Sequence, residues 1–253
     1  MLVGGNEALK PETSKSWIFG GVFSPSFIPR LSIEANHYNI EIESAIQPVD
    51  AAVTLNNCVA GGDATACALV TRAAGGQLTQ IEGLLGNIAG IRTKGIDLNV
   101  AYRTLRTQAG TFGFTWNNTF LKNYDVIIPT ADGTQVISRE GTEQGSPAQG
   151  FPKWKSIGIV DWDGSQFGAT VTGRYVSKLR ESDGNVMKSK FYTDVQLRWM
   201  PEMLGQQWGL AFGVNNLFNT RAPGCNTCDL NNFDPTMYDI PGRYYYFRAG
   251  VKL

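Results

Sequence analysis

The sequence has no long hydrophobic run, only one histidine, and no excess of charge of either sign. No apolar stretch approaches the ~18 residues of a transmembrane helix, which excludes membrane-spanning helices. A membrane is not thereby excluded, because a barrel strand crosses with ~9–11 residues of alternating polarity. Basic and acidic residues balance at 22 each, so charge predicts no nucleic-acid partner. Because His37 is the only histidine, a catalytic arrangement that needs a histidine base has one candidate.

The first residues, Met1–Glu7, lack the basic and apolar segments of a secretory signal. If the chain is exported, we therefore expect either a mature protein or a piece of one. Its four cysteines form two close pairs, and local disulfides persist only in an oxidising compartment. Three pairings are possible, and the spacing favours Cys58 with Cys67 and Cys225 with Cys228.

Alternation of apolar and polar residues dominates the chain, and almost nothing repeats at helical period. In 95–103, for example, Ile96 and Leu98 alternate with Asp97 and Asn99. Nine strands are predicted, at about 14–23, 30–46, 95–103, 112–117, 154–162, 166–175, 191–199, 208–214 and 245–253. The second changes phase, which predicts a β-bulge near Asn36 and His37. The phase of 154–162 is ambiguous.

The connections between these strands alternate in length. The short ones are 24–28, 107–110, 163–165 and 201–206, and the long ones are 47–92, 122–151, 178–188 and 219–242. Tight turns at one end and long loops at the other are typical of outer-membrane barrels. A soluble β-sandwich alternates in polarity too, but its loops need not be sorted in this way. The predicted fold class is therefore all-β, an antiparallel transmembrane β-barrel of about nine strands.

Several motifs resemble the barrel of TonB-dependent receptors. They are the segments Gly5–Ser14 (GNEALKPETS), Asn36–Ile40 (NHYNI), Ile91–Asp97 (IRTKGID), Gly213–Asn219 (GVNNLFN) and Pro241–Tyr246 (PGRYYY). Each is weak alone, but their order covers the whole chain. The resemblance implies that residues 1–253 are the C-terminal part of a 22-stranded barrel, without the plug domain. The chain departs from the family at its last residue, Leu253, where phenylalanine is usual.

The same resemblance implies a receptor that imports a scarce solute, such as a siderophore, a vitamin or an oligosaccharide, in the outer membrane of a Gram-negative bacterium. The implied partners are outer-membrane lipid, the TonB complex through the missing plug, the barrel-assembly machinery through the last strand, and the unknown solute. No nucleic acid, cofactor or metal is expected. One alternative is a passive porin-like or adhesin-like barrel, and a third is a soluble carbohydrate-binding β-protein.

Charged residues on the inward phase of the strands are expected to face the lumen, because on the lipid side each would cost ~2–4 kcal/mol near the midplane. These lumen-facing candidates are Asp97, Arg103, Arg174, Asp194, Arg198 and Arg248. We expect most of them to pair with one another or with a plug, and some to touch a passing solute. Aromatic residues near strand ends suit membrane interfaces, namely Tyr102, Trp116, Tyr175, Phe191, Trp199, Trp208 and Tyr245.

Nothing in the sequence points to an enzyme. Cys225–Cys228 has the spacing of a redox motif or half a zinc site, but its surroundings indicate a loop rather than a helix N-terminus. The paired glycines at 61–62 and 75–76 lack the context of a phosphate-binding loop. We therefore expect His37 to be a wall residue and both cysteine pairs to close surface loops.

Overall fold

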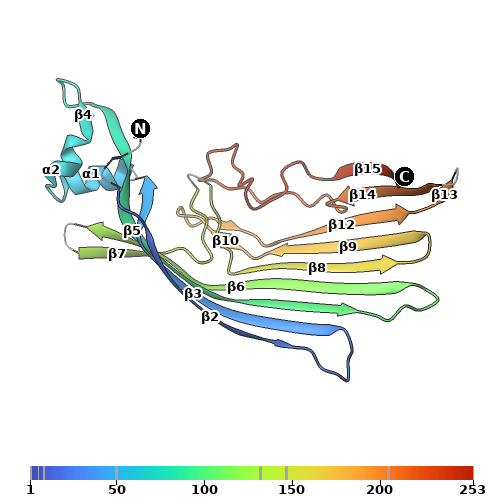
Figure 1. Cartoon of the computed structure of the whole chain (residues 1–253). Coiled ribbons are helices and arrows are strands. Elements are labelled where there is room, and N and C mark those ends of the chain that lie inside the picture. Colours follow the sequence, from blue (N-terminus) through green and yellow to red (C-terminus); the bar gives the residue numbers. More distant parts are fainter. Residues whose placement is uncertain are drawn as a thin grey trace. The chain divides into compact units, whose positions relative to one another are not determined.

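The computed structural model describes residues 2–4, 6–7, 9–48, 51–130, 133–145, 148–203 and 206–252. Nine long strands carry the architecture: β2 (Thr13–Phe23), β3 (Leu31–Pro48), β5 (Leu78–Arg103), β6 (Thr111–Thr130), β8 (Trp154–Asp163), β9 (Phe167–Val176), β12 (Lys190–Trp199), β14 (Gln206–Asn215) and β15 (Tyr244–Lys252). They match the nine predicted strands one for one. The sheet order is β14, β12, β9, β8, β6, β5, β3, β2, with β15 beside β14 (Figure 1).

The structure also contains six short strands and two short helices within the described ranges. They are β1 (Leu2–Gly4), β4 (Val70–Arg72), β7 (Gly133–Ser138), β10 (Leu179–Arg180), β11 (Val186–Met187), β13 (Glu202–Met203), α1 (Ala51–Val59) and α2 (Ala64–Ala68). The pairs β6–β8, β8–β9, β9–β12, β12–β14 and β14–β15 are all antiparallel. The prediction of an all-β antiparallel fold with about nine main strands is confirmed.

The loop boundaries differ from the prediction in two places. Strand β5 begins at Leu78 and β6 extends to Thr130, so much of the expected connections 47–92 and 122–151 is strand. Glycines at 83, 86 and 90 interrupt the apolar alternation in the first part of β5. Backbone pairing does not require that alternation, so the strand continues through them. The helices α1 and α2 were not predicted either. Asp63 begins α2 by accepting the Thr65 N–H at 2.8 Å, a short-range cap that an overall periodicity does not reveal.

The chain divides into two compact units. The first comprises residues 1–17, 39–94 and 123–138, and contains α1, α2, β4 and β7. In it, Cys58 and Cys67 join the two helices, with their sulfurs 2.03 Å apart. Exposed ion pairs join Lys15 to Glu43 and Arg92 to Glu41. The second unit comprises 18–38, 95–122 and 139–253.

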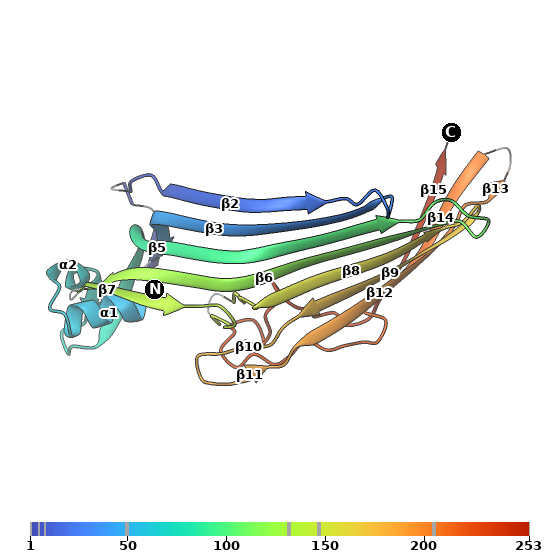
Figure 2. The same cartoon turned by 90° about the horizontal axis from the view of Figure 1, so that it is seen from below.

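Within the second unit, the turns and loops are sorted as predicted (Figure 2). The tight connections at 104–110 and 164–166 lie at one end of the strands, and the long segments 177–189 and 216–243 follow the other end. Gly110 shows why the turns need glycine: its φ is +106°, and a Cβ there would overlap the Asp163 carbonyl oxygen. The bulge expected near Asn36 and His37 stays a prediction.

The hydrophobic core of the second unit lies between its long loops and the ends of β9 and β12, which supply Val176 and Tyr192. Its buried members are Val176, Leu179, Met187, Tyr192, Cys225, Cys228 and Tyr238. The small hairpin of β10 and β11 supplies Leu179 and Met187, which are 0% and 1% exposed. One face of the sheet therefore leaves its apolar side chains uncovered.

Candidate functional site

The register between strands separates an apolar face from a polar face in the second unit. Directly paired residues point to the same side of a sheet. One row across the apolar face runs Phe112, Trp162, Ala169, Leu197, Phe212 and Phe247, and the next runs Phe114, Val160, Val171, Val195, Val214 and Tyr245. Leu197 is 56% exposed and Phe247 67%. An exposed apolar band of this extent needs lipid or protein against it.

The opposite face carries the polar side chains. One row runs Thr111, Asp163, Gly168, Arg198, Ala211 and Arg248, and the next runs Gly113, Asp161, Thr170, Gln196, Gly213 and Tyr246. This register also resolves the ambiguous phase of β8. Ile157, Ile159, Asp161 and Asp163 share the polar face, whereas Val160 and Trp162 lie on the apolar one.

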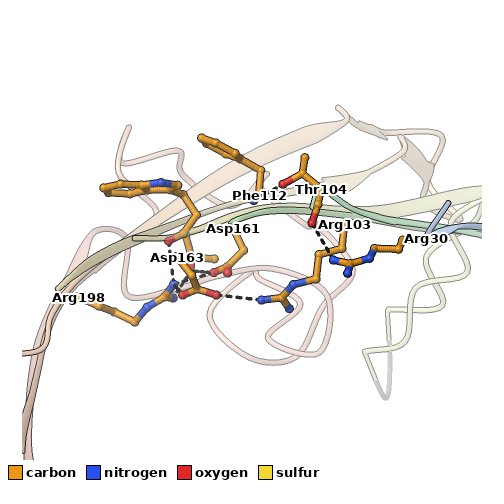
Figure 3. Close-up of polar contacts among 9 residues, drawn as sticks. Arg30, Arg103, Thr104, Phe112, Asp161, Asp163 and Arg198 are labelled. Carbon is orange, nitrogen blue, oxygen red and sulfur yellow. Dashed lines mark hydrogen bonds and ion pairs between the residues drawn. The ribbon is translucent and has the colours of Figure 1, made fainter. Parts of the chain in front are cut away.

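An ion-pair network crosses the polar face near the tight turns (Figure 3). Arg198 donates to Asp161 at 3.0 Å and to Asp163 at 2.8 Å, and Arg103 donates to Asp163 at 3.3 Å. Thr170 links the same groups, since its hydroxyl donates to Asp161 and accepts from Arg198. Two cations and two anions from the three strands β5, β8 and β12 thus neutralise one another.

A second network lies near the long loops. Arg174 on β9 donates to Asp194 on β12 at 2.8 and 3.1 Å, and its Nη1 donates to Asp239 in segment 216–243 at 3.1 Å. The guanidinium carbon also lies 5.1 Å from the centre of the Tyr192 ring. One carboxyl oxygen of Asp194 accepts the Asn216 N–H at 2.8 Å. The beginning and the end of this loop segment are therefore both attached to the wall.

A cavity of about 680 Å³ lies on this wall beside Arg174. Its polar lining includes Asn36, Asp97, Asn99, Asn117, Thr119 and Lys155, and Met237 of segment 216–243 also lines it. Asp97 accepts the Thr119 hydroxyl at 2.8 Å. Beside apolar side chains such as Ile157 and Val176, the lining presents amides and hydroxyls together with the charges of Asp97 and Lys155. Such groups suit a solute that offers hydrogen-bonding atoms.

A smaller cavity of about 200 Å³ lies between the two ion-pair networks. Its lining includes Thr170, Thr172, Asp194, Gln196 and Tyr246, and Gln196 donates to the Tyr246 hydroxyl at 2.8 Å. Polar side chains thus continue along the wall from one network to the other.

The segment that covers one end of the wall is built around the second cysteine pair. Cys225 and Cys228 have sulfurs 1.93 Å apart, at disulfide distance as expected from their spacing. Glu181 of the small hairpin accepts hydrogen bonds from the Thr227 N–H and hydroxyl, both at 2.8 Å. Burial alone would raise the pKa of Glu181, but the bonds from Thr227 and Asn185 outweigh it and hold that pKa below its ordinary value.

Five of the six charges predicted for the lumen take part in these contacts: Asp97, Arg103, Arg174, Asp194 and Arg198. The sixth, Arg248, is exposed and forms no ion pair with any described residue, although it shares the row of Arg198. That the polar face lines a lumen stays a prediction. Sequence reasoning missed Asp161, Asp163 and Asp239. The two-residue spacing of Asp161 and Asp163 was a usable signal, whereas a loop position such as Asp239 had none.

The other residues that the sequence analysis considered for catalysis or metal binding lie in ordinary structural positions. His37 is exposed on β3, and Cys225–Cys228 lies in a loop. Over the described ranges, no group of three or more His, Cys, Asp or Glu could hold a metal ion. In the same ranges, no helix has the length and apolar character to cross a membrane.

Known proteins share this architecture. A family model described as "TonB dependent receptor-like, beta-barrel" matches residues 2–217. No curated protein matches the chain. Among solved structures, the FrpB iron transporter from Neisseria meningitidis (F3-3 variant) is 16% identical with a TM-score of 0.59, over 98% of this chain and 32% of that one.

Two further solved structures match over a similar share of the chain. The siderophore receptor PirA from Acinetobacter baumannii is 16% identical with a TM-score of 0.56, over 97% of this chain and 32% of that one. The ferric enterobactin receptor PfeA from Pseudomonas aeruginosa has the same identity and coverages and a TM-score of 0.59. At this identity the likeness shows the fold alone. The chain spans about a third of the length of these structures.

Proposed function

The chain belongs to the TonB-dependent receptor β-barrel family, and we propose that it supplies the C-terminal part of a barrel that imports a scarce solute. Members of this family are outer-membrane proteins of Gram-negative bacteria, and they are transporters rather than enzymes. The exposed apolar band is then the face that contacts outer-membrane lipid. The polar face, with its two ion-pair networks and its cavity, becomes the wall along which a solute and a plug would lie.

The observation that carries this proposal is the family match over residues 2–217 of a chain that spans about a third of its solved relatives. We propose that a plug, its contact with TonB and the preceding strands are supplied by sequence outside residues 1–253. The last strand, β15, would present the signal to the barrel-assembly machinery. A siderophore, a vitamin and an oligosaccharide are the candidate solutes, and the lining of the larger cavity supports a solute with both hydrogen-bonding groups and apolar parts.

The test is uptake by cells with and without TonB. Cells that produce the whole receptor should accumulate its solute, and deletion of the TonB gene should abolish that accumulation. Uptake that continues unchanged without TonB would instead indicate a passive porin-like barrel. Cells that make only residues 1–253 should import nothing, because an open sheet leaves unpaired backbone groups in the membrane, each costing several kcal/mol.

A further inference from the structure

Two buried carboxyl groups from different loop segments meet in the core of the second unit. Glu143 in segment 139–151 is 1% exposed, and Asp234 in segment 216–243 is fully buried. The two carboxyls are close enough to hydrogen-bond to each other. Among the described residues, neither Glu143 Oε2 nor Asp234 Oδ2 has a hydrogen-bond partner. Each carboxyl thus keeps one buried oxygen that accepts no hydrogen bond, and a proton shared between the two carboxyls would satisfy both of these oxygens.

The other oxygen of each carboxyl is well satisfied, which fixes both side chains in place. Glu143 Oε1 accepts the N–H groups of Gly145 at 3.1 Å and Gln149 at 2.9 Å. Asp234 Oδ1 accepts the Thr236 N–H at 2.7 Å and the Thr236 hydroxyl at 2.6 Å. Neither group can therefore turn away to reach water without losing two hydrogen bonds.

No nearby charge neutralises the pair. Arg174 is bound by Asp194 and Asp239, and Lys153 pairs with Glu140. Within the described ranges, Arg139 and Arg180 form no ion pair with either carboxyl. Tyr238 stays neutral, because burial and the charges of Glu143 and Asp234 raise the pKa of its hydroxyl.

The remaining neighbours offer the pair little. Glu181 is held by Thr227, and the buried Tyr192 hydroxyl has no hydrogen-bond partner among the described residues. Leu179 and Met237 crowd the same place, since a Cβ on Gly150 would lie 2.8 Å from Leu179, 3.0 Å from Met237 and 3.0 Å from Glu143 Oε2. Two ionised carboxylates in such surroundings repel each other and lose their hydration.

We propose that Glu143 and Asp234 share one proton, and that this shared proton latches segment 139–151 to segment 216–243 in a pH-dependent way. Burial first, and the nearby Asp234 in addition, raise the pKa of Glu143 to about 7, against the N–H groups of Gly145 and Gln149 that lower it. Between the ordinary glutamate value of 4.5 and about 7, the folded pair binds a proton that the unfolded chain does not. The latch is therefore closed on the acid side, and its contribution is lost as pH rises through about 7.

Opening the latch would affect the larger cavity. Segment 216–243 also carries Met237, which lines that cavity, and Asp239, which binds Arg174. Loss of the shared proton would release one attachment of this segment and leave the Arg174 contact in place. The inference concerns the loops themselves and does not depend on which solute the barrel carries.

Hydrogen exchange of the whole receptor in native outer membranes tests the latch. Protection factors, which correct for the intrinsic effect of pH, are measured for peptides from 139–151 and 216–243 at pH 6 and pH 8.5. With a pKa near 7, protection in both peptides should fall by up to roughly 10-fold over this range. A peptide from the β8–β9 hairpin should not change. Wild-type loops whose protection is independent of pH would overturn the proposal.

Two substitutions imitate the shared proton permanently. In Glu143→Gln the new amide can donate to Asp234, and in Asp234→Asn the new amide can donate to Glu143. Each variant, once shown to assemble, should keep its loops protected at pH 8.5, while Glu43→Gln in the first unit should behave as wild type. If the Glu143→Gln and Asp234→Asn variants both retained the wild-type pH dependence, the proton would not be the latch.

A bound cation is the competing explanation for the same geometry. A chelator should leave the loops protected at pH 6, because a proton needs no metal. If the chelator instead lowers protection at pH 6, a divalent cation joins the two carboxylates and the proposal is wrong.

Discussion

Arg174 holds Asp239 across 65 positions of the chain, and Asp239 is in the loop segment whereas Arg174 is on the wall. The same guanidinium binds Asp194 on the neighbouring strand, so a single side chain joins β9, β12 and segment 216–243. The side chains of Arg174, Asp194 and Asp239 are only 20–31% exposed, which limits screening by water.

Removing the loop carboxylate should free the segment without disturbing the wall. Asp239→Asn leaves Arg174 paired with Asp194, so the strands should stay intact. Hydrogen bonds between charged groups contribute ~1.5–3 kcal/mol, so we expect hydrogen exchange in 216–243 to accelerate by about 10-fold or more. The matched control is Arg221→Gln, which removes an exposed charge from the same segment. Equal acceleration in both variants would contradict an anchoring role for Asp239.

The two arginines in one row of the polar face should differ in importance. Arg198 binds Asp161 and Asp163, whereas Arg248 is exposed and unpaired among the described residues. Arg198→Gln leaves two neighbouring carboxylates without their main cation, so the temperature of barrel unfolding on gels should fall. Arg248→Gln should change it little. Adding Asp161→Asn to Arg198→Gln should restore part of the loss, because one repelling charge disappears. No difference between the two single variants would count against the network.

The two faces of the sheet should respond oppositely to a new charge. Leu98→Arg and Leu197→Arg place a cation against lipid at ~2–4 kcal/mol near the midplane, so assembly should be impaired. Asn99→Arg and Gln196→Arg change the neighbouring positions on the polar face and should be tolerated. Heat-modifiable migration of the whole receptor reports assembly directly. Equal damage from both sets would show that the faces are not lipid and water.

Both cysteine pairs should be oxidised in protein taken from the outer membrane. Peptide mapping without reductant should recover Cys58 linked to Cys67 and Cys225 linked to Cys228. Loop closure over such short spans predicts a stabilisation of ~2–3 kcal/mol each. Double substitution of Cys225 and Cys228 by alanine should therefore loosen segment 216–243 first, and the β8–β9 hairpin is the internal reference. Free thiols at all four positions would show that the pairing is wrong.

The strands could be predicted because their signal is local. Alternation with a period of two residues places Ile96 and Leu98 on one face, and it also anticipates β9, β12, β14 and β15 closely. The two short helices and the extensions of β5 and β6 were not predicted from the sequence. Their stability comes from a cap, a disulfide and backbone pairing, and none of these produces a long periodic pattern.

The candidate site was only partly predictable for a related reason. The sequence indicated that Arg174, Asp194 and Arg198 share the polar face, since their positions on the strands decide that. Which partners they meet depends on the register between strands, and that register brings Asp161 and Asp163 of β8 within hydrogen-bonding distance of Arg198 across β9. The phase of β8 could not be read from its own sequence, because Ile157 and Ile159 share a face with those two aspartates.

By itself, the sequence determined the approximate place of the nine long strands, the faces of those with a clear alternation, and the sorting of long and short connections. Each of these follows from neighbouring residues and from chain length between strands. Only the tertiary structure decided that Asp239 returns to Arg174 and that Glu143 meets Asp234. Those contacts join positions 65 and 91 residues apart. They exist because the loops fold over an apolar core that they share with the ends of β9 and β12, and no local pattern specifies which buried carboxyl will meet which.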